Sequence, residues 1–91
     1  MIDVARALKI ATDTGEVRFG LREVRRAVKT NAAKLVIVAS NCPPQEVERL
    51  AAPRLHRYPG TNAELGAACG KPFSISALVV LDPGDSNILS A

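Results

Sequence analysis

The 91-residue chain is long enough for one domain, residues 1–91, with a single modest core. Apolar residues make up 47% of it but aromatic residues only 3%, so Ala, Val, Leu and Ile must fill a tightly packed interior. No run of about eighteen apolar residues occurs, and Asp3, Arg6 and Lys9 interrupt the first apolar residues. The composition therefore argues against a membrane span and a signal-peptide core, and we expect an intracellular protein.

Positive charge is concentrated in one stretch of the chain. The net charge is +3, yet six of the twelve basic residues and only one of the nine acidic residues lie between Arg18 and Lys34. A local patch of this kind favours a nucleic-acid partner, although a solvated helix face is the simpler alternative. We expect Cys42 and Cys69 to be free thiols, and two Cys with one His predict neither a metal site nor a cofactor.

The first forty residues predict two helices and two strands. Asp3 suits an N-cap, and the apolar spacing after it predicts a helix from Ile2 to Thr14. Alternating residues over Glu16–Phe19 predict a short strand. A helix follows Gly20 and ends near Thr30–Asn31, and the apolar run Lys34–Ala39 predicts a strand with both faces covered.

The helix after Gly20 separates two kinds of side chain. At 100° per residue, its apolar residues gather on one face, namely Leu21, Val24, Ala27 and Val28. The opposite face carries four cations, Arg22, Arg25, Arg26 and Lys29. Because the helix N-terminus has free N–H groups and follows a glycine without a side chain, this arrangement suits a phosphate backbone.

The second half of the chain repeats the alternation. Two prolines open a helix from Gln45 to about Ala52, and Leu55–Tyr58 predicts a short strand. Thr61 and Glu64 fit a capping box for a helix that runs to about Cys69. Phe73–Leu81 predicts a strand, Asp82–Asp85 a turn, and Ile88–Leu89 a last extended contact.

Strands that alternate with helices predict an α/β fold, a three-layer α/β/α sandwich with a central mixed sheet of about four strands. Ligands of such sheets bind at the carboxyl ends of strands. Those ends are Phe19–Gly20, Ser40–Asn41 and Tyr58–Thr61, and we expect them to converge on one edge of the sheet.

Several stretches resemble a known family. They are Gly20-Leu21-Arg22-Glu23-Val24-Arg25-Arg26, Leu35 to Pro43, Tyr58-Pro59-Gly60-Thr61-Asn62-Ala63-Glu64-Leu65-Gly66, and Gly84-Asp85-Ser86-Asn87-Ile88-Leu89. Together they resemble the archaeal and eukaryotic large-subunit ribosomal protein thirty family, within the kink-turn RNA-binding ribosomal proteins. The resemblance covers nearly the whole chain. It implies a non-catalytic component of the large subunit in the cytoplasm, bound to ribosomal RNA and neighbouring ribosomal proteins, with no small-molecule substrate.

The resemblance also implies a three-part RNA-binding site. The helix after Gly20 would contact the sheared G·A pairs and the backbone at the bend, Asn41 would bind a base edge, and Tyr58 would stack on a base. The implied site residues are Gly20, Leu21, Arg22, Glu23, Arg25, Arg26, Asn41, Tyr58, Pro59, Gly60, Thr61 and Asn62.

Each of these residues also has a simpler structural interpretation. Gly20 could be a tight strand–helix junction, and Asn41 an ordinary turn or cap residue. Tyr58 could pack on the sheet edge, and Glu23 could pair with an arginine three residues on. The segment between Asn41 and Tyr58 is shorter than the family usually has, which predicts a curtailed third helix or following strand.

Other functions compete with the ribosomal one. The related core protein of RNA-modification guide particles usually carries Asn where this chain has Arg22, which argues against it. A small nucleotide-handling enzyme would need a Gly-rich phosphate loop or a catalytic pair, and the sequence offers neither. An apolar interaction module would need more exposed aromatic residues than we expect.

Overall fold

The structure, a computed structural model, describes residues 3–50, 52 and 54–90. Its helices are α1 (Val4–Thr14), α2 (Leu21–Lys29), α3 (Pro44–Leu50) and α4 (Asn62–Ala68). Its strands are β1 (Glu16–Phe19), β2 (Leu35–Val38), β3 (Leu55–Arg57) and β4 (Ala77–Asp82), and a 3-10 turn, η1 (Ile88–Ser90), follows. Among the described helices, none is both long and apolar enough to cross a membrane. The predicted helix start at Ile2 lies outside the described residues.

The four strands form one mixed sheet in the order β1-β4-β2-β3. β2 pairs with β3 in parallel, whereas β4 runs antiparallel to both of its neighbours. β1, β2 and β3 therefore point the same way, and their carboxyl ends lie at the edge of the sheet where β4 begins. This topology confirms the predicted mixed sheet and the predicted convergence of the three strand ends.

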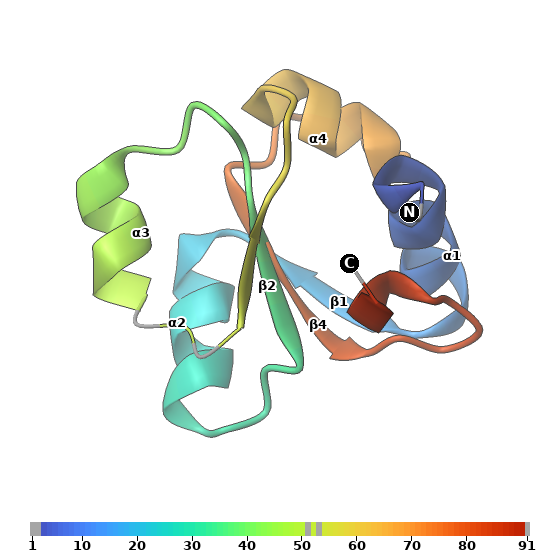
Figure 1. The fold of residues 1–91 in the computed structure, drawn as a ribbon, viewed down its shortest axis with the longest axis horizontal. Coiled ribbons are helices and arrows are strands. Elements are labelled where there is room, and N and C mark those ends of the chain that lie inside the picture. The colour runs from blue at the N-terminus through green and yellow to red at the C-terminus, as the bar shows by residue number, and fades with distance from the viewer. Residues whose placement is uncertain (1–2, 51, 53, 91) are drawn as a thin grey trace.

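Helices cover both faces of the sheet (Figure 1). α1, α4 and η1 lie on one side, and α2 and α3 lie on the other. Alternate residues of β2 serve the two cores, because Leu35 and Ile37 face the first and Val36 and Val38 face the second. All four are buried, and full burial of such a side chain contributes about 1.5–3 kcal/mol. The three-layer α/β/α prediction is confirmed.

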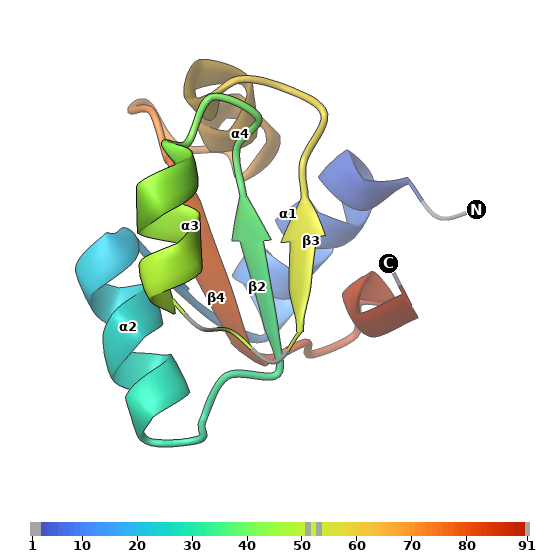
Figure 2. The same cartoon turned by 60° about the vertical axis from the view of Figure 1, so that its left-hand side comes forward.

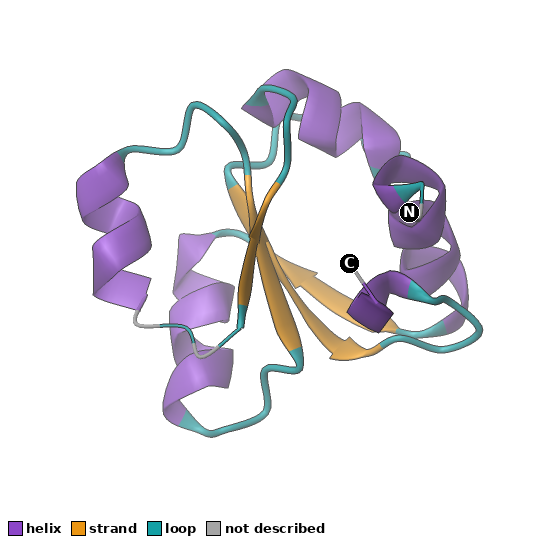
Figure 3. Ribbon diagram, in the orientation of Figure 1, coloured by secondary structure: helices purple, strands orange, loops and turns teal. Residues whose placement is uncertain are grey.

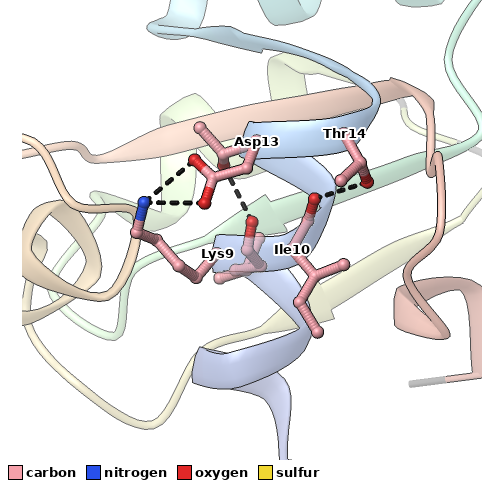
Figure 4. A network of polar contacts seen from close by, with 6 residues as sticks. Lys9, Ile10, Asp13 and Thr14 are labelled. Atoms are coloured by element: carbon pink, nitrogen blue, oxygen red, sulfur yellow. Dashed lines mark hydrogen bonds and ion pairs between the residues drawn. The ribbon is translucent and has the colours of Figure 1, made fainter.

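α1 is stabilised by local polar contacts along its exposed side. The Asp3 carboxylate accepts a hydrogen bond from the Arg6 N–H at 3.2 Å, as the predicted N-cap requires. The Lys9 ammonium donates to both oxygens of Asp13 at 2.9 Å, and the Thr14 hydroxyl donates to the Ile10 carbonyl at 2.7 Å (Figure 4). These contacts leave the opposite side of α1 to pack against the sheet through Ala7, Leu8 and Ala11.

The segment between β2 and α4 contains short elements, as its short length predicts. α3 has seven residues and β3 has three. Figure 2 shows these two short elements beside β2. The helix predicted from Gln45 to about Ala52 is present as α3, but both of its ends differ. The helix begins one residue earlier, because proline at the first helical position needs no N–H acceptor, and Ala52 lies outside it.

Two predictions near the C-terminus are also wrong. The last strand begins at Ala77 rather than Phe73, because Ile75 donates its N–H to the Asn62 carbonyl of α4 at 2.9 Å and not to a neighbouring strand. Ile88–Leu89 is not extended but forms η1, where Ser90 donates to the Asn87 carbonyl at 2.9 Å. Ile88 is thereby fully buried against the first core.

Candidate nucleic-acid interface

Four segments meet at the edge where β1, β2 and β3 end. Backbone hydrogen bonds join them: Gly20 N–H to the Ala77 carbonyl at 2.9 Å, Ala39 N–H to Ser76 at 2.8 Å, and Ser40 N–H to Gly60 at 2.9 Å. Figure 2 shows β2 and β3 ending side by side at the top, and Figure 3 shows that loops form this edge. The edge therefore brings together the β1–α2 junction, the end of β2, the β3–α4 loop and the loop before β4.

Gly20 has a backbone conformation that needs glycine. Its φ is 101° and its ψ is 154°. A residue with a side chain would adopt this conformation only at a cost of about 1–3 kcal/mol. A Cβ atom built on Gly20 would meet nothing within 4 Å, so the surface in front of it is open. Helix α2 has no side-chain cap, and the N–H groups of its first residues have no intrahelical acceptor. The strand–helix junction and an open approach to the backbone thus coincide at Gly20.

The cationic face of α2 is present as predicted. Val24 and Ala27 are buried, whereas the four cations are exposed: Arg22, Arg25, Arg26 and Lys29. Among the described residues, none of these four forms an ion pair, and Glu23 forms none with Arg26. The alternative in which Glu23 simply pairs with an arginine is therefore not realised. The positive charge of this face remains available to a polyanion.

Asn41 connects the end of β2 to the start of α4. Its Oδ1 accepts the Asn62 backbone N–H at 2.9 Å, and its Nδ2 donates to Asn62 Oδ1 at 3.2 Å. Asn41 is exposed, and within the described residues its second Nδ2 hydrogen has no partner. This side chain therefore fixes the loop and still presents a donor to the outside.

The β3–α4 loop has a rigid end. The Thr61 hydroxyl accepts the Glu64 N–H at 3.4 Å, and the Glu64 carboxylate accepts the Thr61 N–H at 3.2 Å. This is the capping box that the sequence predicts. Pro59 and Thr61 are exposed, while Gly60 is half-buried.

Tyr58 is less exposed than an aromatic residue that is free to stack on a base. The ring is half-buried and packs against the core formed by α1 and α4. A Cβ on Gly60 would lie 2.7 Å from Tyr58 Cε2, so the ring lies directly against the loop backbone. Burial, with smaller contributions from Glu64, Cys69 and Asp3, raises the pKa of Tyr58. The Tyr58 ring therefore supports the loop from the side of the core. Its stacking on a base stays a prediction.

The structure adds one residue that the sequence interpretation missed. Phe73 is 54% exposed and lies in the loop that precedes β4 at the same edge. Gly66 lets this loop pass close to α4, because a Cβ there would lie 2.0 Å from the Phe73 carbonyl oxygen. The neighbouring Lys71 ammonium lies 5.2 Å from the centre of the Phe19 ring. Pro72 already bounded the predicted strand on its N-terminal side, and no local signal separated Phe73 from it.

The two cysteines lie in the interior. Cys42 and Cys69 are buried free thiols, as expected. Burial raises the pKa of Cys69 to about 11, and it also raises the pKa of Cys42, where Glu46 adds a smaller effect. In the part of the chain that the structure describes, no three His, Cys, Asp or Glu side chains cluster to hold a metal ion.

Comparison with known proteins gives a consistent result over almost the whole chain. Residues 3–90 match the model of the ribosomal protein L7Ae/L30e/S12e/Gadd45 family. The large ribosomal subunit protein eL30 of Pyrobaculum calidifontis is 45% identical, covering 98% of this chain and 94% of the relative. The eL30 proteins of Methanobrevibacter smithii and Methanothermobacter thermautotrophicus are 42% and 39% identical, covering 98% and 97% of this chain and 96% of each relative.

Proposed function

Because the chain belongs to the ribosomal protein L7Ae/L30e/S12e/Gadd45 family, we propose that it is a structural protein of the large ribosomal subunit that binds ribosomal RNA. The relatives compared above are named large ribosomal subunit protein eL30, and they align over nearly their full length. The family is structural and non-enzymatic, so the enzyme alternative is set aside. Within the subunit the protein contacts ribosomal RNA and neighbouring ribosomal proteins.

The RNA element that this edge fits best is a kinked one. The observation that carries this proposal is that four segments, joined by backbone hydrogen bonds, present an open glycine, a cationic helix and an exposed amide together. A straight duplex offers phosphates but hides its base edges in a deep, narrow groove. A bent internal loop exposes unstacked bases beside two backbones, which matches polar and aromatic groups flanked by cations.

The proposed roles follow from the chemistry of each group. Gly20 allows the RNA backbone to approach closely, and the first N–H groups of α2 donate to its phosphates. Arg22 and Arg26 also contact phosphates. Asn41 donates its second amide hydrogen to a base edge. Phe73 stacks on an unpaired base, a role for which it is better exposed than Tyr58.

The guide-particle alternative shares this type of site. Arg22 favours the ribosomal assignment, as do the names of the relatives. The two functions differ in the particle that the protein joins, so fractionation of cell extracts distinguishes them. We expect the protein to sediment with large ribosomal subunits at moderate salt, and recovery in small guide-RNA particles alone would contradict the proposal.

Binding to matched RNAs tests the kinked-RNA proposal directly. One RNA carries a kink-turn, and the other replaces its internal loop by Watson–Crick pairs at the same length. We expect at least tenfold tighter binding of the kinked RNA at equal salt, because only that RNA exposes bases. Equal affinity for both RNAs would reduce the protein to a general polyanion binder.

A further inference from the structure

A hollow lies between α1 and the segment that joins β4 to η1, on the side of the molecule opposite α2 (Figure 1). Its volume is about 330 Å³. Six residues line it: Asp3, Arg6, Ala7, Ile10, Asp85 and Asn87. None of the six belongs to the proposed RNA site. The proposed RNA contacts therefore leave this surface free.

The hollow is a preformed feature of the fold, because contacts between distant parts of the chain hold its walls. The Ser86 hydroxyl donates to the Ala7 carbonyl at 2.6 Å, and the Asp85 N–H donates to the Thr14 hydroxyl at 3.0 Å. Ile88, further along the same segment, is fully buried in the core that includes Ala7. These contacts fasten the segment after β4 to α1.

The polar side chains around the hollow have few partners within the protein. Four of them are exposed, namely Asp3, Arg6, Asp85 and Asn87. Among the described residues, the last three form no side-chain hydrogen bond or ion pair, and the Asp3 carboxylate accepts only a backbone N–H. By contrast, Lys9 and Asp13 on the same helix pair with each other at 2.9 Å. The hollow thus presents free donors and acceptors beside buried Ala7 and half-buried Ile10.

The charge of the hollow favours a basic partner. Two carboxylates against one guanidinium leave an excess of negative charge there, and outside Arg18–Lys34 the chain carries eight acidic and six basic residues. This charge repels phosphates, so an RNA backbone is disfavoured. Proteins that bind the same ribosomal RNA carry an excess of Lys and Arg. A basic segment of such a protein complements the hollow.

The length of the hollow fits an extended peptide. From Asp3 to Ile10 the wall formed by α1 is about 10 Å long, which equals about three residues of an extended chain. Arg6 can donate to backbone carbonyls of that chain, and the Asn87 amide can both donate and accept. Asp3 and Asp85 are then placed to bind its Lys or Arg side chains.

We infer that this hollow docks an extended, basic segment of a neighbouring protein of the large subunit. The inference rests on the proposed function, because that function places the protein beside other ribosomal proteins. It assigns different partners to different parts of the fold. RNA binds at the edge where β1, β2 and β3 end, and a protein binds against α1 and the segment after β4.

Photo-crosslinking in assembled large subunits tests the inference. A benzophenone amino acid replaces Asn87 in one variant and Phe73, in the proposed RNA site, in another. We expect the label at position 87 to join a ribosomal protein through a segment that contains Lys or Arg, which mass spectrometry of the joined peptide identifies. The label at position 73 should join ribosomal RNA.

Charge variants test the two carboxylates of the hollow. Asp3→Asn keeps an N-cap acceptor, and Asp85 has no side-chain partner among the described residues, so the double variant Asp3→Asn/Asp85→Asn should fold. We expect it to lower the crosslink yield at position 87 about fivefold and to change the affinity for kinked RNA less than about twofold. Glu48→Gln removes an exposed carboxylate from α3 and is the control, which should change neither measurement. Circular dichroism checks that each variant is folded.

The outcomes separate this inference from the proposed function. A crosslink from position 87 to ribosomal RNA, or no crosslink there in assembled subunits, would overturn the inference. A joined segment without Lys or Arg would also overturn it, as would an undiminished yield in the folded double variant. If the unlabelled protein does not enter large subunits, the proposed function itself fails.

Discussion

The side chain of Asn41 forms two hydrogen bonds with Asn62, 21 residues further along the chain. In one of them, Asn41 Oδ1 accepts the backbone N–H of Asn62, the first residue of α4. A residue that follows β2 therefore caps the start of a helix that follows β3. A residue proposed to bind RNA thus also holds the loop that forms the neighbouring part of the site. Substitution of Asn41 must separate these two roles.

Asn41→Asp and Asn41→Ala separate them. The aspartate loses the bond that Nδ2 donates to Asn62, but it still accepts the Asn62 N–H and places a negative charge at a helix N-terminus, so we expect stability within about 1 kcal/mol of wild type. It cannot donate to a base, and RNA affinity should fall at least tenfold. Asn41→Ala should lose a similar affinity and about 1 kcal/mol of stability. Urea unfolding and RNA gel shifts measure both, and wild-type affinity of Asn41→Asp would contradict the base contact.

Gly20→Ala tests the junction between β1 and α2. Because φ is 101°, an alanine there is strained, and we expect the free energy of unfolding to fall by about 1–3 kcal/mol. The methyl group would also project into the open surface and weaken RNA binding. Lys29→Ala, an exposed change at the other end of α2, is the control and should change stability by less than about 0.5 kcal/mol. Equal stability of the two variants would show that the glycine conformation is not required.

Phe73→Ala tests the aromatic residue that the sequence did not single out. Since the ring is 54% exposed, we expect little change in thermal unfolding but about a tenfold loss of affinity for kinked RNA. Phe73→Trp should keep the affinity, because it keeps a ring that can stack. The stacking proposal fails if alanine and tryptophan bind the RNA equally well.

Stability should decrease in mild alkali because of Cys69. Burial raises its pKa from 9.0 to about 11, so the unfolded chain loses the thiol proton first. The stabilising effect of the protonated thiol is complete below pH 9 and is lost as the pH rises towards 11. We expect unfolding to become about 1 kcal/mol easier between pH 8 and pH 10. Cys69→Ala should be less stable at pH 8 but less sensitive to pH, and an unchanged pH dependence would contradict this assignment.

Much of the fold could be predicted because its signals are local. The 3.6-residue period of Leu21, Val24 and Val28 defines a buried helix face wherever the helix lies. The uninterrupted apolar run from Leu35 to Val38 defines a strand covered on both faces, and the structure buries all four residues. The capping box of Thr61 and Glu64 depends only on neighbours three residues apart.

The errors arise where distant segments determine the backbone. Phe73–Ser74–Ile75 has the composition of a strand, yet Gly66 and Asn62 of α4 contact this loop and keep it out of the sheet. Tyr58 could be placed at the end of a strand, but only packing against α1 and α4 makes its ring half-buried.

The sequence by itself therefore determined the kinds of element, the family resemblance and the cationic face of α2, since each depends on residue types at fixed spacing. Only the tertiary structure decided which of these groups meet. The pairing of Asn41 with Asn62 and the exposure of Phe73 depend on sheet order and helix packing. These contacts join residues far apart in the chain, and no local spacing specifies them.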